Sequence, residues 1–198
     1  VPPPSVGPIQ SWRDFERYPW PTVEQVDFSD VEWLQRNLPE NMAFWAMGYL
    51  FQQVSNLIGF TQLCMMLFEN RALIQAVAEK VGTLYARFQD VMCQFSRCGA
   101  INIGDDMGHK SATLIAPDDL RELFIPWQKQ ITEVARRHGK LRIFHTCGQV
   151  AAIMDDLLDT VGIDAKHSTQ DCIEPITVAK QRWGGRTALL GGVDVDFI

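Results

Sequence analysis

Residues 141–168 read LRIFHTCGQVAAIMDDLLDTVGIDAKHS, and this stretch decides the fold class. It begins with a strand-like segment, LRIFH, and ends with another, IDAKHS. Between them, Val150, Ile153, Leu157 and Val161 fall at helical spacing, and Gly162 stands where a helix is expected to end. A strand, a helix and a strand joined by short connections predict a parallel βαβ unit.

The same alternation continues on both sides of this stretch. Three further segments have strand character, namely residues 41–50 (a strand or a short helix), residues 100–107 and residues 187–194. An apolar stripe from Leu63 to Phe95 predicts two amphipathic helices broken near Glu69–Asn70. Further helices are expected from Pro117 to about His138 and from Glu174 to about Gly184, because Pro is favoured at the start of a helix and Gly after its end.

Polar residues that can take part in catalysis or ligand binding lie at the carboxyl ends of the expected strands: Asp105, Asp106, His145, Cys147, His167 and Asp194. In a (β/α)₈ barrel this rim is where side chains from several strands assemble a site. No G-x-G-x-x-G follows any strand, which disfavours an open dinucleotide-binding sheet. The sequence therefore predicts the α/β class and a (β/α)₈ TIM barrel. Only part of it is expected in this chain, because a complete barrel takes about 250 residues.

The chain is expected to divide near residue 40. Residues 1–40 are rich in Pro and Trp and show weak periodicity, which predicts an irregular arm with a short helix near Asp30–Asn37. Residues 41–198 are predicted to form the partial TIM-barrel domain.

Composition excludes several classes of protein. The 198 residues are 46% hydrophobic and carry a net charge of −6 without long basic runs, which argues against nucleic acid as a partner. The apolar runs are too short to span a membrane, and no secretory signal is visible. Five cysteines without small-domain spacing are expected to be reduced, so a cytoplasmic location is predicted.

His145 and Cys147 are candidate metal ligands. Alternate residues of a strand point to one face, and imidazole and thiolate are ligands that Zn²⁺ prefers. A third ligand has to come from elsewhere: Cys172, His167, Asp105, or a residue beyond Ile198. The alternative is that His145 only caps the strand and Cys147 packs as a small apolar residue.

Asp105 and Asp106 are candidate catalytic residues. Adjacent carboxylates repel each other at a partly buried rim, so the pKa of one of them should rise, which suits acid–base work or a cationic substrate. The alternative is a solvated loop before the next helix.

Three segments together resemble the uroporphyrinogen decarboxylase superfamily, which includes decarboxylases and cobalamin-related methyltransferases. They are GDDMGHKSATLIAPDDLRELFIPW (residues 104–127), HTCGQVAAIMDDLLDTVGIDA (residues 145–165) and LLGGVDVDFI (residues 189–198). Residues 41–100 match more loosely and residues 1–40 hardly at all. The family fold is a single (β/α)₈ barrel.

The resemblance implies a role for the H-x-C pair. In the methyltransferase branch, H-x-C supplies two zinc ligands and a later cysteine the third, which would fall past Ile198. Zinc there activates a thiol that attacks a methyl group carried on a corrinoid. The resemblance thus implies metal ligation by His145 and Cys147. The leading hypothesis from the residues adds Asp105 or Asp106 as an acid/base or substrate contact, and His167 and Asp194 as pocket residues that bind substrate.

Two other functions stay open. The decarboxylase branch acts on a tetrapyrrole without a cofactor, but the matching strand there normally carries no H-x-C. A third interpretation is a non-catalytic barrel that binds a corrinoid or a partner protein, supported by the Trp-rich arm. The expected partners are a small-molecule substrate and a corrinoid protein, with a homo-oligomer left open.

Overall fold

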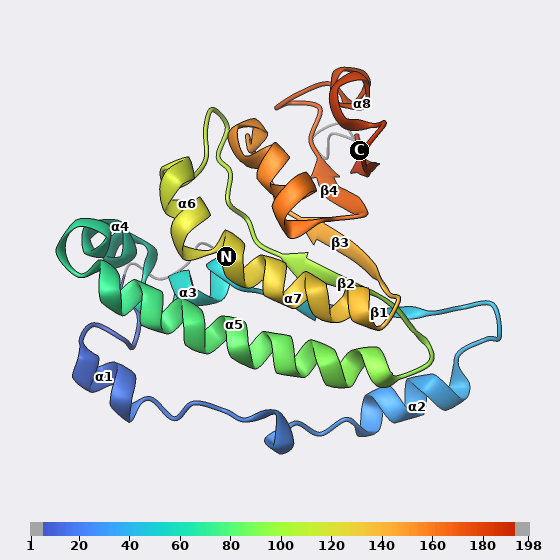
Figure 1. The fold of residues 1–198 in the computed structure, drawn as a ribbon, viewed down its shortest axis with the longest axis horizontal. Helices are drawn as coiled ribbons and strands as arrows, with labels where there is room; N and C mark the ends of the chain where they lie inside the picture. Colours follow the sequence, from blue (N-terminus) through green and yellow to red (C-terminus); the bar gives the residue numbers. More distant parts are fainter. Residues whose placement is uncertain (1–5, 193–198) are drawn as a thin grey trace.

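Five parallel strands lie in the sheet in the order in which the chain forms them (Figure 1). The computed structural model describes residues 6–192, and there the strands are β1 (Phe44–Gly48), β2 (Cys98–Gly104), β3 (Leu141–His145), β4 (Ala165–Thr169) and β5 (Ala188–Gly191). Every neighbouring pair is parallel and is joined through at least one helical segment. These are consecutive βα units, as the sequence predicts, and residues 41–50 contain a strand.

The helices follow the sequence pattern with five differences. They are α1 (Trp12–Arg17), η1 (Val23–Gln25), α2 (Ser29–Asn37), α3 (Phe51–Ile58), α4 (Phe60–Glu69), α5 (Arg71–Gln94), α6 (Pro117–Leu123), α7 (Ile125–Arg137), η2 (Ala151–Ile153), η3 (Asp156–Val161) and α8 (Ile176–Trp183). The break expected near Glu69–Asn70 separates α4 from α5, and the helix expected near Asp30–Asn37 is α2. Three of the differences are α1, η1 and α3, which the sequence pattern did not predict.

The other two differences are interruptions of expected helices. The helix expected from Pro117 to about His138 is broken at Phe124 into α6 and α7. Pro126 explains the break, because it has no N–H to donate to the carbonyl one turn earlier. The segment after Val150 winds as a short 3₁₀ turn and then as a π-helix that ends at Gly162, whose φ is +74°.

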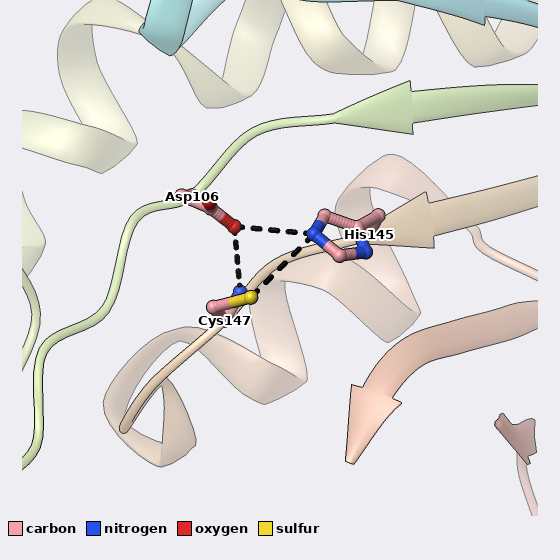
Figure 2. Close-up of side chains that lie close together, drawn as sticks. All are labelled: Asp106, His145 and Cys147. Carbon is pink, nitrogen blue, oxygen red and sulfur yellow. Dashed lines mark hydrogen bonds and ion pairs between the residues drawn. The ribbon is translucent and has the colours of Figure 1, made fainter. Parts of the chain in front are cut away.

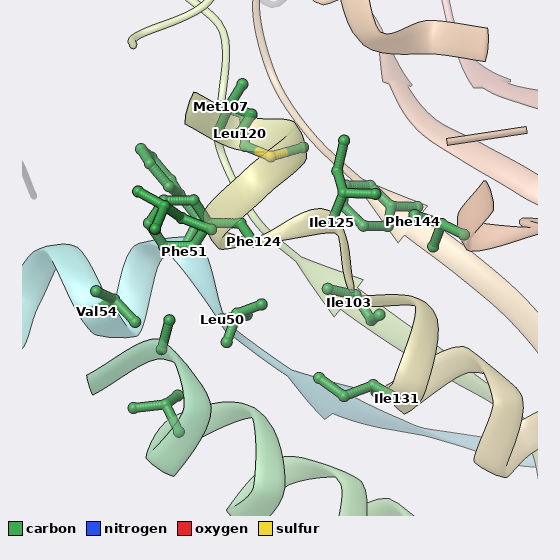
Figure 3. Packing of buried hydrophobic residues seen from close by; sticks show 14 of the residues in the cluster. Leu50, Phe51, Val54, Ile103, Met107, Leu120, Phe124, Ile125, Ile131 and Phe144 are labelled. Carbon is green, nitrogen blue, oxygen red and sulfur yellow. The ribbon is translucent and has the colours of Figure 1, made fainter. Parts of the chain in front are cut away.

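The hydrophobic core lies between the sheet and the helices on one of its faces. Ile103 of β2 and Phe144 of β3 are fully buried and belong to one apolar cluster with Ile125 and Ile131 of α7 (Figure 3). Because side chains alternate along a strand, His145 points to the opposite face of the sheet.

That opposite face is open within the described residues. Trp45 of β1 and Leu141 of β3 lie in one row across the sheet and are 58% and 59% exposed. In a barrel this face becomes the interior, so His145 sits on the barrel's inner side.

The N-terminal arm runs along the outer side of α5, away from the sheet (Figure 1). Ile9 is fully buried, and Phe15 and Trp20 pack against the main core, whereas Trp33 is 58% exposed. The division near residue 40 stays a prediction. Among residues 6–192 no helix combines the length and the apolar character needed to cross a bilayer.

Candidate metal centre

The register of two strands brings the candidate residues together. Gly104 of β2 pairs with His145 of β3, and the Asp105 N–H donates to the His145 carbonyl at 2.9 Å, which extends the ladder. Asp106 lies two residues past Gly104, and Cys147 lies two residues past His145. Parallel pairing therefore places Asp106 beside Cys147 at the carboxyl end of the sheet.

Three side chains converge at this point (Figure 2). Nε2 of His145 lies 3.3 Å from Oδ1 of Asp106 and 3.5 Å from Sγ of Cys147. One donor atom from each of the three residues lies within 4.8 Å of the others. The side chains of His145 and Asp106 are 28% and 48% exposed, so a ligand can reach them from solvent.

The two loops that carry Asp106 and Cys147 are held against each other. The Cys147 N–H donates to Oδ1 of Asp106 at 2.9 Å, and the Met107 N–H donates to Oγ1 of Thr146 at 3.1 Å. The loops touch at glycines: a Cβ on Gly108 would lie 2.5 Å from the carbonyl oxygen of Cys147. Backbone contact thus fixes the distance between the carboxylate and the thiol.

His145 and Asp106 form an ion pair. The hydrogen bond from His145 lowers the pKa of Asp106 to about 2. The same hydrogen bond is the largest of the effects that raise the pKa of His145 to about 9, and Cys147 adds to it. A metal ion that binds Nε2 of His145 has to displace this proton.

The geometry differs from that of a cysteine nucleophile with a histidine base. In such a triad the imidazole contacts the nucleophile through one ring nitrogen and the carboxylate through the other. Here Nε2 of His145 faces both Cys147 and Asp106, while Nδ1 lies 2.6 Å from Nδ1 of His167. The three donors converge on one point instead of forming a proton relay.

The donor set fits zinc. Zinc bonds of about 2.0–2.2 Å to N and O and about 2.3 Å to S place neighbouring ligand atoms of a tetrahedron about 3.3–3.6 Å apart. The two separations at Nε2 of His145 are 3.3 Å and 3.5 Å. Three protein ligands leave one position open, as in catalytic zinc sites.

The third donor, Asp106, is not among the third-ligand candidates that the sequence suggests. Cys172 is exposed, and within residues 6–192 it does not belong to the converging group, nor does His167. One feature of the sequence points to Asp106: it lies two residues past the end of β2, as Cys147 lies two residues past the end of β3. This feature identifies a ligand pair only when the register of β2 against β3 is known.

The remaining candidates lie in different surroundings. Asp105 is 0% exposed, and its carboxylate accepts the N–H of Leu50 at 2.7 Å and Nε2 of Gln128 at 2.8 Å. Asp194 lies outside the described residues. Catalytic roles for Asp105 and Asp106, and substrate binding by His167 and Asp194, stay predictions.

Comparison with known proteins adds a family and a fold. Residues 7–198 match the family model described as Uroporphyrinogen decarboxylase (URO-D). No curated protein matches the sequence. A solved structure, a methyltransferase from Methanosarcina mazei, superposes with a TM-score of 0.72 at 16% sequence identity, over 100% of this chain and 56% of that chain.

These comparisons agree with the fold and leave the activity open. At 16% sequence identity, the similarity to the methyltransferase shows a common fold and does not show a common activity. This chain spans little more than half of that protein's length. The five parallel strands of residues 6–192 and the helical segments that connect them are part of a (β/α)₈ barrel. Because the family model matches nearly the whole sequence, the chain belongs to the uroporphyrinogen decarboxylase family.

Proposed function

We propose that this chain is a methyltransferase of the uroporphyrinogen decarboxylase family and holds zinc through Asp106, His145 and Cys147. The observation that carries the proposal is the convergence of imidazole, carboxylate and thiol on one solvent-accessible point at the carboxyl end of the sheet. The fold similarity to a methyltransferase supports it.

Zinc bound there would take the sulfur of a thiol substrate in its open position and lower the pKa of that thiol, which prepares the thiolate to attack a methyl group on a corrinoid. The protein's own residues set the charge of the site. The carboxylate of Asp106 and the thiolate of Cys147 together offset a divalent charge, and His145 binds as a neutral imidazole. The methyl donor is expected to be a corrinoid carried by a partner protein.

The experiment combines zinc content with turnover. We expect about one zinc ion per chain by elemental analysis. With methylcobalamin as donor and 2-mercaptoethanol, cysteine and homocysteine as acceptors, loss of the methylcobalamin absorbance should depend on that zinc. Cys147→Ala should lose both the zinc and the turnover, whereas Cys172→Ala, which changes an exposed cysteine outside the group, should keep both.

Two results would reject the proposal. One is a folded, zinc-free protein that still demethylates methylcobalamin. The other is decarboxylation of uroporphyrinogen at a rate that chelators and Cys147→Ala leave unchanged, which would favour the decarboxylase branch.

A further inference from the structure

A second histidine lies against the side of His145 that faces away from the donor group. The pairing of β3 with β4 sets His145 directly opposite His167. The centroids of their rings are 4.7 Å apart, and Nδ1 of one lies 2.6 Å from Nδ1 of the other. A hydrogen bond between them requires that one of the two nitrogens donates a proton and the other accepts it.

The position of that proton follows from the metal site. A neutral imidazole carries one proton, and the nitrogen that binds a metal has to be free of it. Nε2 of His145 faces Asp106 and Cys147 and would bind the metal. The single proton of the neutral His145 ring then belongs on Nδ1. If His167 donated to His145 instead, the proton of His145 would sit on Nε2 and block the metal.

We propose that His167 is a positioning residue for the metal centre: its Nδ1 accepts the N–H of His145 and holds Nε2 of His145 toward the ion. The inference rests on the proposed zinc site. It also assigns the proton of His167 to its Nε2, which remains available for other contacts. Partners of this kind fix both the tautomer and the orientation of a ligating imidazole, and losing one typically weakens metal binding by about 10- to 100-fold.

Three substitutions separate hydrogen bonding from packing. In His167→Asn the side-chain oxygen stands as many bonds from Cα as Nδ1 does, so it can accept the same proton. His167→Gln places its polar atoms one bond further out, and His167→Leu keeps the branching but accepts nothing. Zinc affinity is measured by competition with a chromophoric chelator, and circular dichroism reports whether each variant is folded.

We expect His167→Leu and His167→Gln to bind zinc about 10- to 100-fold more weakly than the wild type, and His167→Asn to stay within a few-fold. Wild-type affinity in His167→Leu would overturn the inference. So would a loss in all three variants as complete as in Cys147→Ala, because that result makes His167 a ligand. If the wild type itself takes up no zinc, the proposed function fails first.

A measurement on the unmodified protein covers the case in which the variants do not fold. The ¹⁵N chemical shifts of the histidine rings report which nitrogen carries the proton. We expect the neutral Nε2–H tautomer for His167 and a proton on Nδ1 of His145. A proton on Nδ1 of His167 would overturn the inference.

Discussion

Two adjacent carboxylates at the end of β2 have opposite surroundings. The side chain of Asp106 is 48% exposed and faces His145, whereas Asp105 is fully buried. One oxygen of Asp105 accepts the N–H groups of Leu50 and Gln52 at the start of α3, at 2.7 Å and 3.3 Å. Burial raises the pKa of Asp105, although these hydrogen bonds favour its charged form. Asp105 thus anchors α3 to the sheet, and Asp106 is left for the site.

The buried hydrogen bonds of Asp105 predict that two substitutions of this residue differ in their effect on the free energy of unfolding. Asp105→Ala would remove the carboxylate that accepts from three donors, the N–H groups of Leu50 and Gln52 and Nε2 of Gln128, and should lower the free energy of unfolding by about 3 kcal/mol. Asp105→Asn keeps an acceptor for α3, and the Gln128 amide can rotate so that its unpaired Oε1 accepts from the new amide. We expect Asp105→Asn to change stability by less than about 1 kcal/mol.

Urea denaturation measures both variants, and zinc binding supplies the control. Asp105→Asn should bind zinc as the wild type does, whereas Asp106→Asn should bind it much more weakly. Equal destabilisation by Asp105→Asn and Asp105→Ala would contradict the anchoring role.

The sequence predicted that His145, Cys147, Asp105 and Asp106 lie at the rim. It could not predict that Asp105 stabilises the fold whereas Asp106 belongs to the candidate metal site. Two neighbouring Asp residues are chemically identical in a sequence. What separates them is the register of β2 against β3 and the position of α3, and both depend on contacts between distant segments.

At the scale of elements, the site depends on how the loops after β2 and β3 cross. Gly148 has a φ of +76°, and a Cβ there would lie 2.4 Å from the backbone carbon of Gly108. In the other direction, a Cβ on Gly108 would lie 2.8 Å from the backbone nitrogen of Gln149. If a side chain at either glycine pushed the two backbone segments apart, Asp106 would move away from Cys147.

Gly108→Ala should therefore act on the site from a distance. Because the new methyl group meets backbone atoms, the loops have to separate, and we expect zinc affinity to fall about tenfold or more. Gly185→Ala is the matched control, since a Cβ there has no other atom within 4 Å. Chelator competition on the two variants checks this, and unchanged affinity in Gly108→Ala would show that the crossing does not set the ligand spacing.

Periodicity predicted most elements but not their interruptions. The break near Glu69–Asn70 was predicted and separates α4 from α5, and Gly162 ends η3 where a terminal glycine was expected. The apolar pattern did not predict the break at Phe124, because it continues across this residue, although Pro126 follows two residues later. Winding as a π-helix over Asp156–Val161 leaves no mark in the spacing of apolar residues.

At the scale of the whole molecule, the sheet separates packing from chemistry. One face carries Ile103 and Phe144 into the helical layer, and the other carries His145 and His167 on neighbouring strands. The alternation of strands and helices was enough to predict a parallel α/β sheet and part of a barrel. The composition of the site was not, because the third donor depends on strand register.

X-ray absorption spectroscopy at the zinc edge on the purified protein tests the proposed zinc site most directly. We expect one sulfur at about 2.3 Å and nitrogen or oxygen neighbours at about 2.0–2.2 Å in the wild type, and no zinc–sulfur signal in Cys147→Ala, because that variant does not hold the ion. A zinc ion bound without sulfur in the wild type, or a sulfur signal that survives Cys147→Ala, would contradict the proposed site.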